Sequence, residues 1–455
     1  MTLKKQRSLL NRANEASDML QQHIINGNVI RIISHNDADG ISAASVIANA
    51  ISEEGGQFHT TIVPRLKSDF IKELAKESYK LFIFSDMGSA CLKYINRLNA
   101  DAIITDHHQP SEIEENDNVV HVNPHLFGID GSRELSGAGS AYISVRDLGE
   151  SGKKHLSYFG LIGAFGDMQG QNGFSSVNQL ILDDGFESNV LEIQDDLKIV
   201  SKNQEPLYKS LAYTLDPGLP GLTGDLEGSR TFLEEIGLSY GVKFVDLEGE
   251  ERDILKEELI KINPAIFGKS YIIPKESPQL QNLEEYAYLL DSCGKSKKFG
   301  LAVGICLGER EKAMDVAFDL QRKYREQLIK GMEWISREGS INHDYFQYIY
   351  SENNDLKRIM GTIASVGISI GLLSPDKPIL ALARMQDDIK ISGRTTREMV
   401  EKGVNLGKAL DDASHSYGGQ GGGHDIAAGA LIPYNQKDNF LNLFNDIIEH
   451  QLENS

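Results

Sequence analysis

The sequence is poor in cysteine, and its three cysteines lie far apart. Because Cys91, Cys293 and Cys306 are odd in number and widely spaced, neither a disulfide framework nor the paired spacing of a zinc site follows from them. A reducing compartment is therefore expected. The charged N-terminus lacks the apolar core of a signal peptide. No stretch reaches the roughly 18 apolar residues of a membrane-spanning helix, so a cytoplasmic protein without membrane contact is predicted.

Positive charge is also scarce. The 455 residues contain 46 Lys and Arg against 66 Asp and Glu, a net charge of −20. This balance argues against a basic nucleic-acid coat or a binder of anionic membranes, although a local basic groove stays compatible with it. The hydrophobic share of 40% and the charged share of 25% are ordinary for a soluble globular protein. At about 100–200 residues per domain, the length predicts two or three domains.

Short β-branched runs alternate with helical patterns near the N-terminus. Strands are predicted at 28–34, 58–64, 81–86, 101–108 and 118–124, and helices at 1–26, 41–52, 68–77 and 91–100. This alternation is typical of right-handed βαβ units and a doubly wound parallel sheet, so the fold class is α/β. We predict a catalytic α/β domain over 1–180, an acidic and largely helical connector over 181–350, and a smaller α/β domain over 351–455.

Polar residues follow the predicted strands. They are His35, Asp37, Asp39, Asp86, Asp106, His107 and His108. In open α/β sheets this carboxyl edge is where ligands bind. Within HNDADG (35–40), alternate residues of an extended strand end are expected to point to one side, which would bring the histidine and both aspartates together. Asp167 in GAFGDMQG ends a helix-like apolar run and adds a further carboxylate.

These clusters together favour a metal site. Each of them alone also fits a helix cap or a turn, but four at the same expected edge favour a common ligand. One imidazole with several carboxylates suits manganese, magnesium or zinc. Six or more ligands exceed the needs of one ion, and such sites usually hold two metals about 3.5–4 Å apart for hydrolytic phosphoryl transfer.

Five motifs, in order, resemble those of a known superfamily. HNDADG, SDMGS (85–89), TDHH (105–108) and GAFGDMQG (163–170) resemble motifs I to IV of the DHH phosphoesterases, and KISGR…GGQGGGHDIAAG (390–429) resembles their DHHA1 module. That combination occurs in RecJ-type exonucleases and in oligoribonucleotide and cyclic-dinucleotide phosphodiesterases. The inorganic pyrophosphatases of the superfamily carry a different C-terminal module.

The resemblance implies a two-metal site, with Mn²⁺ as the expected ion and Mg²⁺ as the alternative. It assigns one metal to His35 and Asp37, the other to Asp39, His107 and Asp167, and a bridging position to Asp86. The catalytic set implied is Asp86, Asp106 and His108. His108 would polarise the scissile phosphate or help to protonate the leaving oxygen, and Asp106 would orient the histidine pair.

The C-terminal module is implied to bind substrate. Arg394 would hold a phosphate through its planar guanidinium, and Gly421, Gly422 and Gly423 would let backbone N–H groups approach it, with His424 beside them. The glycine run also fits a flexible linker, but the apolar segment that follows indicates a loop inside a fold rather than between folds. Residues 384–408 carry six basic and four acidic side chains, a local positive excess that suits a polyanionic substrate.

Two departures from bacterial RecJ point to a subfamily. Bacterial RecJ usually begins the first motif with aspartate, whereas His35 resembles the archaeal RecJ-like branch and several phosphodiesterases. Only about 30 residues follow the GGGH sequence, so the OB-fold with which bacterial RecJ holds single strands is not expected. LAYTLDPGLPGLTGD (211–225) resembles archaeal RecJ homologues, including the nuclease that associates with the GINS replication complex.

The leading prediction is a phosphodiesterase of the archaeal RecJ-like type. It would act in DNA replication or repair and release 5′-mononucleotides from single-stranded DNA. Whether it also cleaves RNA is left open. A phosphodiesterase of short oligoribonucleotides or cyclic dinucleotides is one alternative, and a replisome scaffold is another. Residues 181–260 hold 19 acidic and 7 basic side chains. This acidic segment is predicted either to face a protein partner such as GINS or to be a solvated insert, and it carries −12 of the net charge.

Overall fold

The chain divides into two compact units. The computed structural model describes residues 2–111, 113–170 and 173–454. The first unit comprises Met1–Gln194 and Lys269–Gln321, and the second comprises Asp195–Gly268 and Arg322–Ser455. Helix α13 (Lys312–Glu338) is long and rich in charged residues, and its sequence runs from the first unit into the second. None of the described helices is both long and apolar enough to cross a membrane. The predicted boundaries of three domains stay a prediction.

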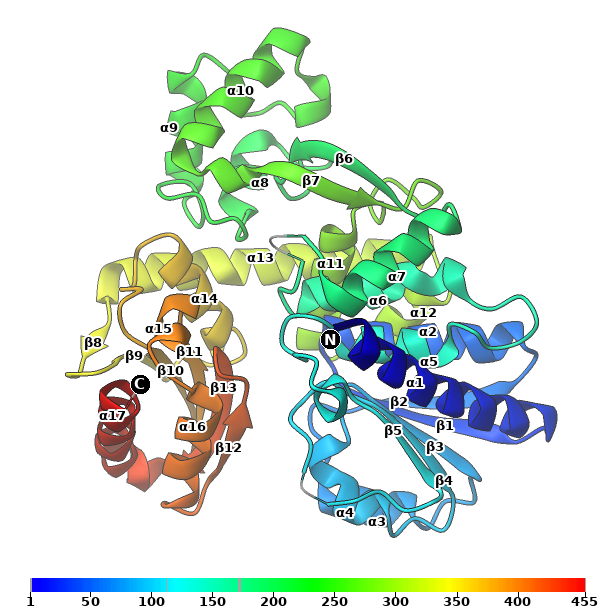
Figure 1. Ribbon diagram of the computed structural model, residues 1–455. Helices are drawn as coiled ribbons and strands as arrows, with labels where there is room; N and C mark the ends of the chain where they lie inside the picture. Colours follow the sequence, from blue (N-terminus) through cyan, green and yellow to red (C-terminus); the bar gives the residue numbers. More distant parts are fainter. Residues whose placement is uncertain (1, 112, 171–172, 455) are drawn as a thin grey trace. The chain divides into compact units, whose positions relative to one another are not determined.

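A five-stranded parallel sheet forms the centre of the first unit, as Figure 1 shows. In sheet order its strands are β2 (Gln57–Ile62), β1 (Val29–Ser34), β3 (Leu81–Ser85), β4 (Asp101–Thr105) and β5 (Val119–Val122). The chain runs from β1 outward to β2 and then returns to β3 on the other side of β1. The predicted doubly wound parallel sheet is therefore confirmed.

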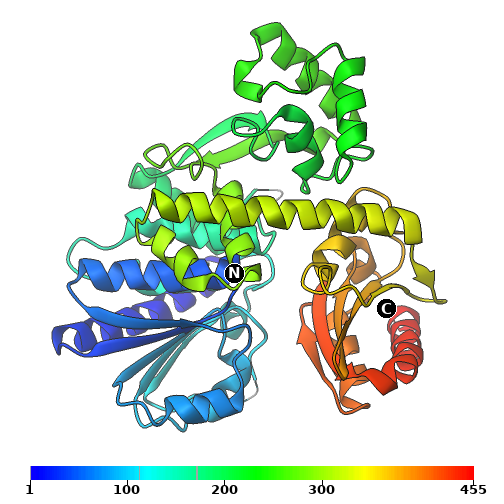
Figure 2. The same ribbon diagram turned by 180° about the vertical axis from the view of Figure 1, so that it is seen from behind.

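Helices cover both faces of this sheet, which Figure 2 shows from behind. One face carries α1 (Thr2–Ile25), α2 (Ala38–Glu53) and α5 (Gly137–Val145), with α6 (Ser157–Gly166) packed on α2 and α5; the other carries α3 (Ser68–Leu74) and α4 (Leu92–Ile95). Side chains alternate between the faces, so that Ile83 joins the first core while Phe82 and Phe84 join the second. Burial of each such side chain contributes about 1.5–3 kcal/mol.

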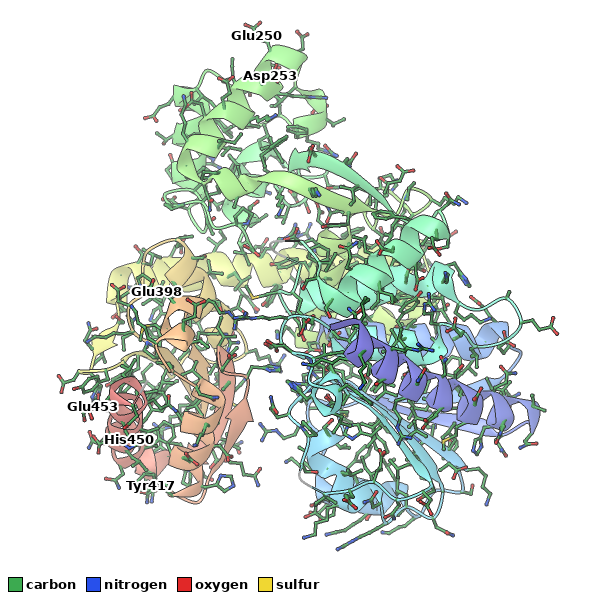
Figure 3. All side chains as sticks on the ribbon, in the orientation of Figure 1. Glu250, Asp253, Glu398, Tyr417, His450 and Glu453 are labelled. Atoms are coloured by element: carbon green, nitrogen blue, oxygen red, sulfur yellow. The ribbon has the colours of Figure 1, made fainter. Side chains whose placement is uncertain are left out.

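Later helices complete the first core. They are α7 (Ser176–Glu187), α11 (Leu283–Lys295) and α12 (Phe299–Cys306). The acidic insertion, residues 198–266, contains α8 (Leu207–Tyr213), α9 (Leu226–Glu235) and α10 (Gly249–Ile262). It has a hydrophobic core of its own. Glu250 and Asp253 extend outward from α10 in Figure 3. The insertion is helical as predicted, but β6 (Glu192–Leu197) and β7 (Phe267–Ile272), a two-stranded sheet, flank it.

The second unit contains a mixed six-stranded sheet. In sheet order the strands are β12 (Gln420–Gly423), β13 (Ala427–Pro433), β11 (Asp388–Arg394), β10 (Ile379–Met385), β9 (Gln347–Ser351) and β8 (Ile341–Asn342). Helices α16 (Leu406–His415) and α17 (Lys437–Glu453) cover the face that carries Ile389 and Ile391. Helix α14 (Met360–Ser369) packs on β10 and β11.

Two local predictions for this unit are wrong. The pattern of residues 395–413 predicts a single helix, but the chain forms two, α15 (Arg397–Glu401) and α16, because Gly403 adopts a φ of 98° between them. The glycine run expected as a loop is the edge strand β12, which pairs with β13 through its backbone. Because three of the four residues of β12 are glycines, the backbone of this edge is open to close approach.

Candidate active site

The candidate site lies where the order of the sheet reverses. Because β2 lies on one side of β1 and β3 on the other, the topological switch point falls between β1 and β3. His35 directly follows β1, Asp86 directly follows β3, and Asp106 directly follows β4. The parallel sheet therefore brings together the polar residues that the sequence places at its strand ends.

Asp37 and Asp39 reach this site through a helix start. Asp37 caps α2, where its Oδ1 accepts the N–H of Gly40 at 3.0 Å, and Asp39 lies in the first turn of the helix. The expected extended alternation is therefore wrong for Asp39, because the chain becomes helical at Ala38. The aspartates still converge, since an N-cap residue and the first turn both lie at the sheet edge where α2 begins.

Asp39 is anchored by the N-terminus of another helix. Its two oxygens accept the backbone N–H groups of Gly137 at 2.7 Å and Ala138 at 2.8 Å, at the start of α5. The partial positive charge of a helix N-terminus favours a carboxylate there. The side chain is only 1% exposed. Burial, together with the negative charge of Asp86, nevertheless raises the pKa of Asp39 to about 7.

His107 directs one ring nitrogen into a group of carboxylates. Its Nδ1 lies 2.7 Å from the carbonyl oxygen of Gly131, and a carbonyl only accepts, so Nδ1 carries a proton. Its Nε2 lies 3.6 Å from Asp39, 3.3 Å from Asp86 and 3.2 Å from Asp167. In the neutral ring, Nε2 would turn a lone pair toward carboxylate oxygens. A cation, either a proton or a metal ion, must therefore lie among these atoms.

Asp86 faces two groups of ligand atoms at once. Its Oδ2 lies 3.4 Å from His35 Nδ1, which is 2.7 Å from Asp37, and its Oδ1 lies 3.3 Å from His107 Nε2. Within the described chain, Oδ1 is buried without a well-formed hydrogen bond. The backbone of Asp86 has a φ of 53°, a left-handed conformation that costs a non-glycine residue about 1–3 kcal/mol and is concentrated at functional sites.

The electrostatics of the cluster favour bound cations. Burial and the charge of Asp39 raise the pKa of Asp167 well above its usual range. Burial and the charge of Asp37 push the pKa of Asp86 upward, but the nearby rings of His107 and His35 outweigh them and leave it lowered. Clusters of ligand atoms within 4.8 Å of one another are formed by His35, Asp37 and Asp86 and by Asp39, Asp86 and His107. These hard oxygen and imidazole donors fit divalent metal ions, and the two clusters share Asp86.

Asp106 and His108 form a pair beside this cluster. Asp106 Oδ1 lies 2.8 Å from His108 Nδ1, and Oδ2 accepts the N–H of Ser89 at 2.9 Å. Burial would raise the pKa of Asp106, but His108 and these hydrogen bonds hold it below its usual range. The carboxylate of Asp106 is therefore occupied in holding His108 and the neighbouring backbone. The side chain of His108 is 41% exposed, so the ring is accessible.

The substrate-binding residues predicted for the second unit gather at one end of its sheet. Arg394 pairs with Ala427 between β11 and β13, and Gly423 pairs with Ala428 between β12 and β13. The guanidinium of Arg394 donates to Ser365 Oγ at 3.0 Å on the α14 side. The N–H of His424 donates to the carbonyl of Ala427 at 2.9 Å and closes the turn after β12.

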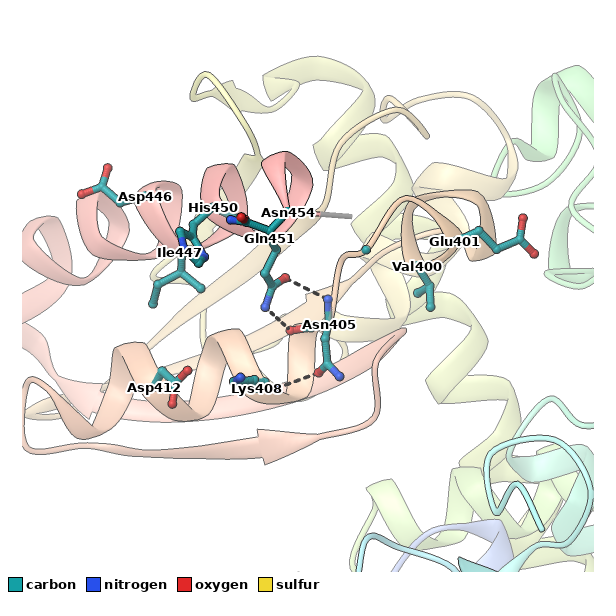
Figure 4. A pocket seen from close by; sticks show the side chains of 11 residues that line it. Val400, Glu401, Asn405, Lys408, Asp412, Asp446, Ile447, His450, Gln451 and Asn454 are labelled. Carbon is teal, nitrogen blue, oxygen red and sulfur yellow. Dashed lines mark hydrogen bonds between the residues drawn. The ribbon is translucent and has the colours of Figure 1, made fainter. Parts of the chain in front are cut away.

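A surface groove of about 860 Å³ lies on the face of this sheet away from α14, between α15–α16 and α17. Figure 4 shows Asn405 and Gln451 joined across it by two hydrogen bonds of 2.9 and 3.2 Å. Its rim mixes Lys408 and His450 with acidic side chains. None of the predicted site residues in the described chain lines this groove.

Several residues that support the site were missed from the sequence. They are Ser89, Asn123, Gly131, Gly137, Gly163 and Gln169. Most of them act through backbone groups or small size, which leave no charged signature. The small-residue run GAGSA (137–141) was the available signal, because a helix that approaches a carboxylate closely must begin with small residues.

Three family models match successive parts of the chain. The DHH family N-terminal domain matches residues 29–158, the DHH-CID domain residues 199–265, and the DHHA1 domain residues 348–450. An uncharacterized protein of Methanocaldococcus jannaschii is 31% identical over 431 residues, which cover 93% of this chain and 94% of that protein. The single-stranded-DNA-specific exonuclease RecJ of Bacillus subtilis is 30% identical over 139 residues, 28% of this chain and 17% of RecJ.

Solved structures share the fold over almost the whole chain. RecJ of Thermus thermophilus in complex with Mn²⁺ superposes with a TM-score of 0.62 at 15% identity, covering 96% of this chain and 55% of RecJ. This chain therefore corresponds to about half of that RecJ. CDC45 of Entamoeba histolytica superposes with a TM-score of 0.70 at 10% identity, covering 97% of this chain and 99% of CDC45. At these identities the likeness is one of fold.

Proposed function

The chain belongs to the DHH family of phosphoesterases, and from this membership we propose that it is a metal-dependent exonuclease of single-stranded DNA. Family membership makes it a hydrolase of phosphodiester bonds. The choice of substrate is supported by the sequence similarity to RecJ of Bacillus subtilis, which is specific for single-stranded DNA. The observation that carries the proposal is the pair of histidine–aspartate clusters that share Asp86.

The proposal assigns two divalent ions to these clusters. His35 and Asp37 would hold one ion, His107 with Asp39 and Asp167 the other, and Asp86 would contact both. Manganese is the expected ion, because the Thermus RecJ structure contains Mn²⁺, and magnesium is the alternative. Bound there, divalent ions would lower the pKa of a water molecule and offset the negative charge of a phosphate.

The protein's own groups would bind the phosphate and supply a proton. Partial burial lowers the pKa of His108, but the adjacent Asp106 carboxylate outweighs it and raises the pKa above the ordinary value. With Nδ1 directed at Asp106, a protonated His108 would present Nε2–H to the leaving oxygen as a general acid. In the second unit, Arg394, His424 and the backbone of Gly421, Gly422 and Gly423 would bind the nucleotide phosphates.

A second role, binding a protein partner, is supported by a different part of the chain. The DHH-CID match over residues 199–265 coincides with the acidic insertion, and the fold likeness to CDC45 covers 97% of this chain and 99% of CDC45. We propose that this insertion docks a replication protein, with the GINS complex as the expected partner. Such docking is compatible with catalysis, because the predicted catalytic residues lie outside the insertion.

A product ladder tests the catalytic proposal. DNA and RNA oligonucleotides labelled at the 5′ or the 3′ end would be incubated with Mn²⁺ or Mg²⁺, with cyclic dinucleotides and pyrophosphate as comparison substrates. Stepwise release of 5′-mononucleotides from long single-stranded DNA is expected. Cleavage confined to substrates of a few nucleotides would instead identify a small-substrate phosphodiesterase.

Two aspartate variants test the metal assignment. Asp86→Asn should lose the activity, whereas Asp183→Asn, which changes an exposed aspartate on α7, should retain it. Wild-type activity in Asp86→Asn would contradict the assignment of a shared carboxylate.

A further inference from the structure

We propose that Asn123 is a positioning residue that holds His108 in its catalytic orientation. The inference rests on the role of His108 in the proposed function. It concerns a side chain that neither the motifs nor the metal clusters include. Asn123 directly follows β5 and is 0% exposed, so its amide is removed from water and must be satisfied by the protein.

The amide of Asn123 joins the segments that follow three strands. Its Nδ2 donates to the carbonyl oxygen of His108 at 2.8 Å, after β4, and to Ser89 Oγ at 2.9 Å, after β3. Its Oδ1 accepts the N–H of His125 at 2.9 Å, after β5. A backbone N–H only donates, so this bond fixes which amide atom is oxygen, and both remaining bonds must be donated by nitrogen.

A second path runs from Asn123 to the ring of His108. Ser89 receives one Asn123 hydrogen bond at Oγ, and its own N–H donates to Asp106 Oδ2 at 2.9 Å. Asp106 Oδ1 in turn holds His108 Nδ1 at 2.8 Å. The buried ring of His121 lies 2.8 Å from Ser89 Oγ and gives that hydroxyl a second hydrogen-bond partner. Asn123 therefore holds the backbone of His108 directly and its imidazole through Ser89 and Asp106.

His108 needs such support more than the expected metal ligands do. It lies in an irregular segment after β4, and its side chain is 41% exposed, so packing alone does not hold the ring. The expected ligands have separate anchors, since Asp39 is bound by the start of α5 and His107 by Gly131. A displacement of about 1 Å at a catalytic group can reduce the rate about 100-fold. Loss of Asn123 should therefore impair turnover and spare metal binding.

The first experiment compares two asparagines of the same strand region. Asn123→Ala removes the proposed support, whereas Asn118→Ala removes an equivalent side-chain bond, from Asn118 Nδ2 to the carbonyl of Ala100, at the other end of β5. Asn123→Ala is expected to lower kcat about 10- to 100-fold, with KM and the Mn²⁺ dissociation constant within about threefold of wild type. Asn118→Ala should leave all three unchanged. A parallel loss of kcat and Mn²⁺ affinity in Asn123→Ala would overturn the proposal.

The second experiment asks whether Asn123 acts through His108. In the His108→Ala background, Asn123→Ala should lower kcat no further, because there is no imidazole left to position. If Asn123→Ala lowered kcat by the same factor with and without His108, the positioning role would be refuted while the proposed function stayed intact. Wild-type kcat in His108→Ala alone would instead refute the role of His108 and this inference with it. Should Asn123→Ala fail to fold, Asn123→Asp replaces it, since it keeps the bond from His125 and loses both donors.

Discussion

A methyl group added to Gly163 is expected to disable the proposed metal site, although Gly163 offers no ligand atom. Gly163 lies in α6, and a Cβ there would lie 2.1 Å from Asp39 Oδ1 and 2.4 Å from the Cβ of Ala138. Real Cβ contacts essentially never fall below 3.0 Å. In Gly163→Ala, either the carboxylate of Asp39 must move by about 0.9 Å or α6 must retreat from α2 and α5.

The size of the effect follows from the bonds that this displacement breaks. Asp39 Oδ1 accepts the N–H of Ala138 at 2.8 Å, and a shift of that size takes the pair outside hydrogen-bonding geometry. A buried hydrogen bond to a charged group contributes about 1.5–3 kcal/mol. Without this bond the Asp39 carboxylate is no longer held in position to bind an ion. The affinity for Mn²⁺ should therefore fall about 10- to 150-fold. Cleavage of single-stranded DNA at limiting Mn²⁺ should fall by a similar factor.

The same helix supplies the control. A Cβ on Gly160 would lie 3.3 Å from both Ile181 Cγ2 and the Cβ of Tyr142, contacts that small adjustments can absorb. Alanine also favours a helix over glycine by about 1 kcal/mol, so Gly160→Ala should be at least as stable as wild type. Mn²⁺ titration calorimetry, oligonucleotide cleavage and thermal unfolding would be measured for both variants. Wild-type Mn²⁺ binding by Gly163→Ala, or equal losses in both variants, would refute the reasoning.

Three further predictions concern pH, metal affinity and stability. Since the pKa values of Asp39 and Asp167 are raised in the metal-free fold, these two groups hold protons above pH 5 that the unfolded chain has lost, and the free energy of unfolding should fall as pH rises from about 5 through 7. Thermal unfolding in EDTA should show this, and a Tm that increases over that range would contradict it; Mn²⁺ at about 100 times its Kd should restore about 2.7 kcal/mol at pH 8. Gln169→Ala removes a donor to the Gly131 carbonyl that orients His107; titration should show Mn²⁺ bound about tenfold more weakly, with kcat at saturating Mn²⁺ nearly unchanged. Asp184→Asn breaks the bidentate pair with Arg146, whose bonds measure 2.5 and 2.8 Å, and urea unfolding should show a loss of about 3 kcal/mol without a change in kcat.

The sequence predicted those parts of the fold that depend on local pattern. Alternating strands and helices identified the parallel sheet, and the topology of such a sheet requires His35 and Asp86 to meet at its carboxyl edge. Their roles as ligands stay a prediction, although the structure brings the expected residues of the first unit together. The break at Gly403 was missed because one glycine within a helical pattern is often tolerated.

The support of the site depends on contacts between distant residues. Asp39 meets Gly137 across 98 positions, and Asn123 meets Ser89 across 34. Such pairings are fixed by how α5 packs on α2 and by the order of the strands, and neither leaves a local pattern. His121 and Gln169 gave no signal for the same reason, because a single sequence does not distinguish a buried histidine or glutamine from an exposed one.

The way α11 packs limits how this chain can be divided. All residues assigned to the metal site precede residue 170, yet the first unit also includes Lys269–Gln321, which follows the insertion. A Cβ on Gly294 in α11 would lie 1.9 Å from the carbonyl oxygen of Asn36, so this helix rests directly on the turn between His35 and Asp37. During synthesis, the turn stays uncovered until the whole insertion has left the ribosome. A fragment that ends before residue 269 would carry every expected ligand and still expose the apolar side of α2.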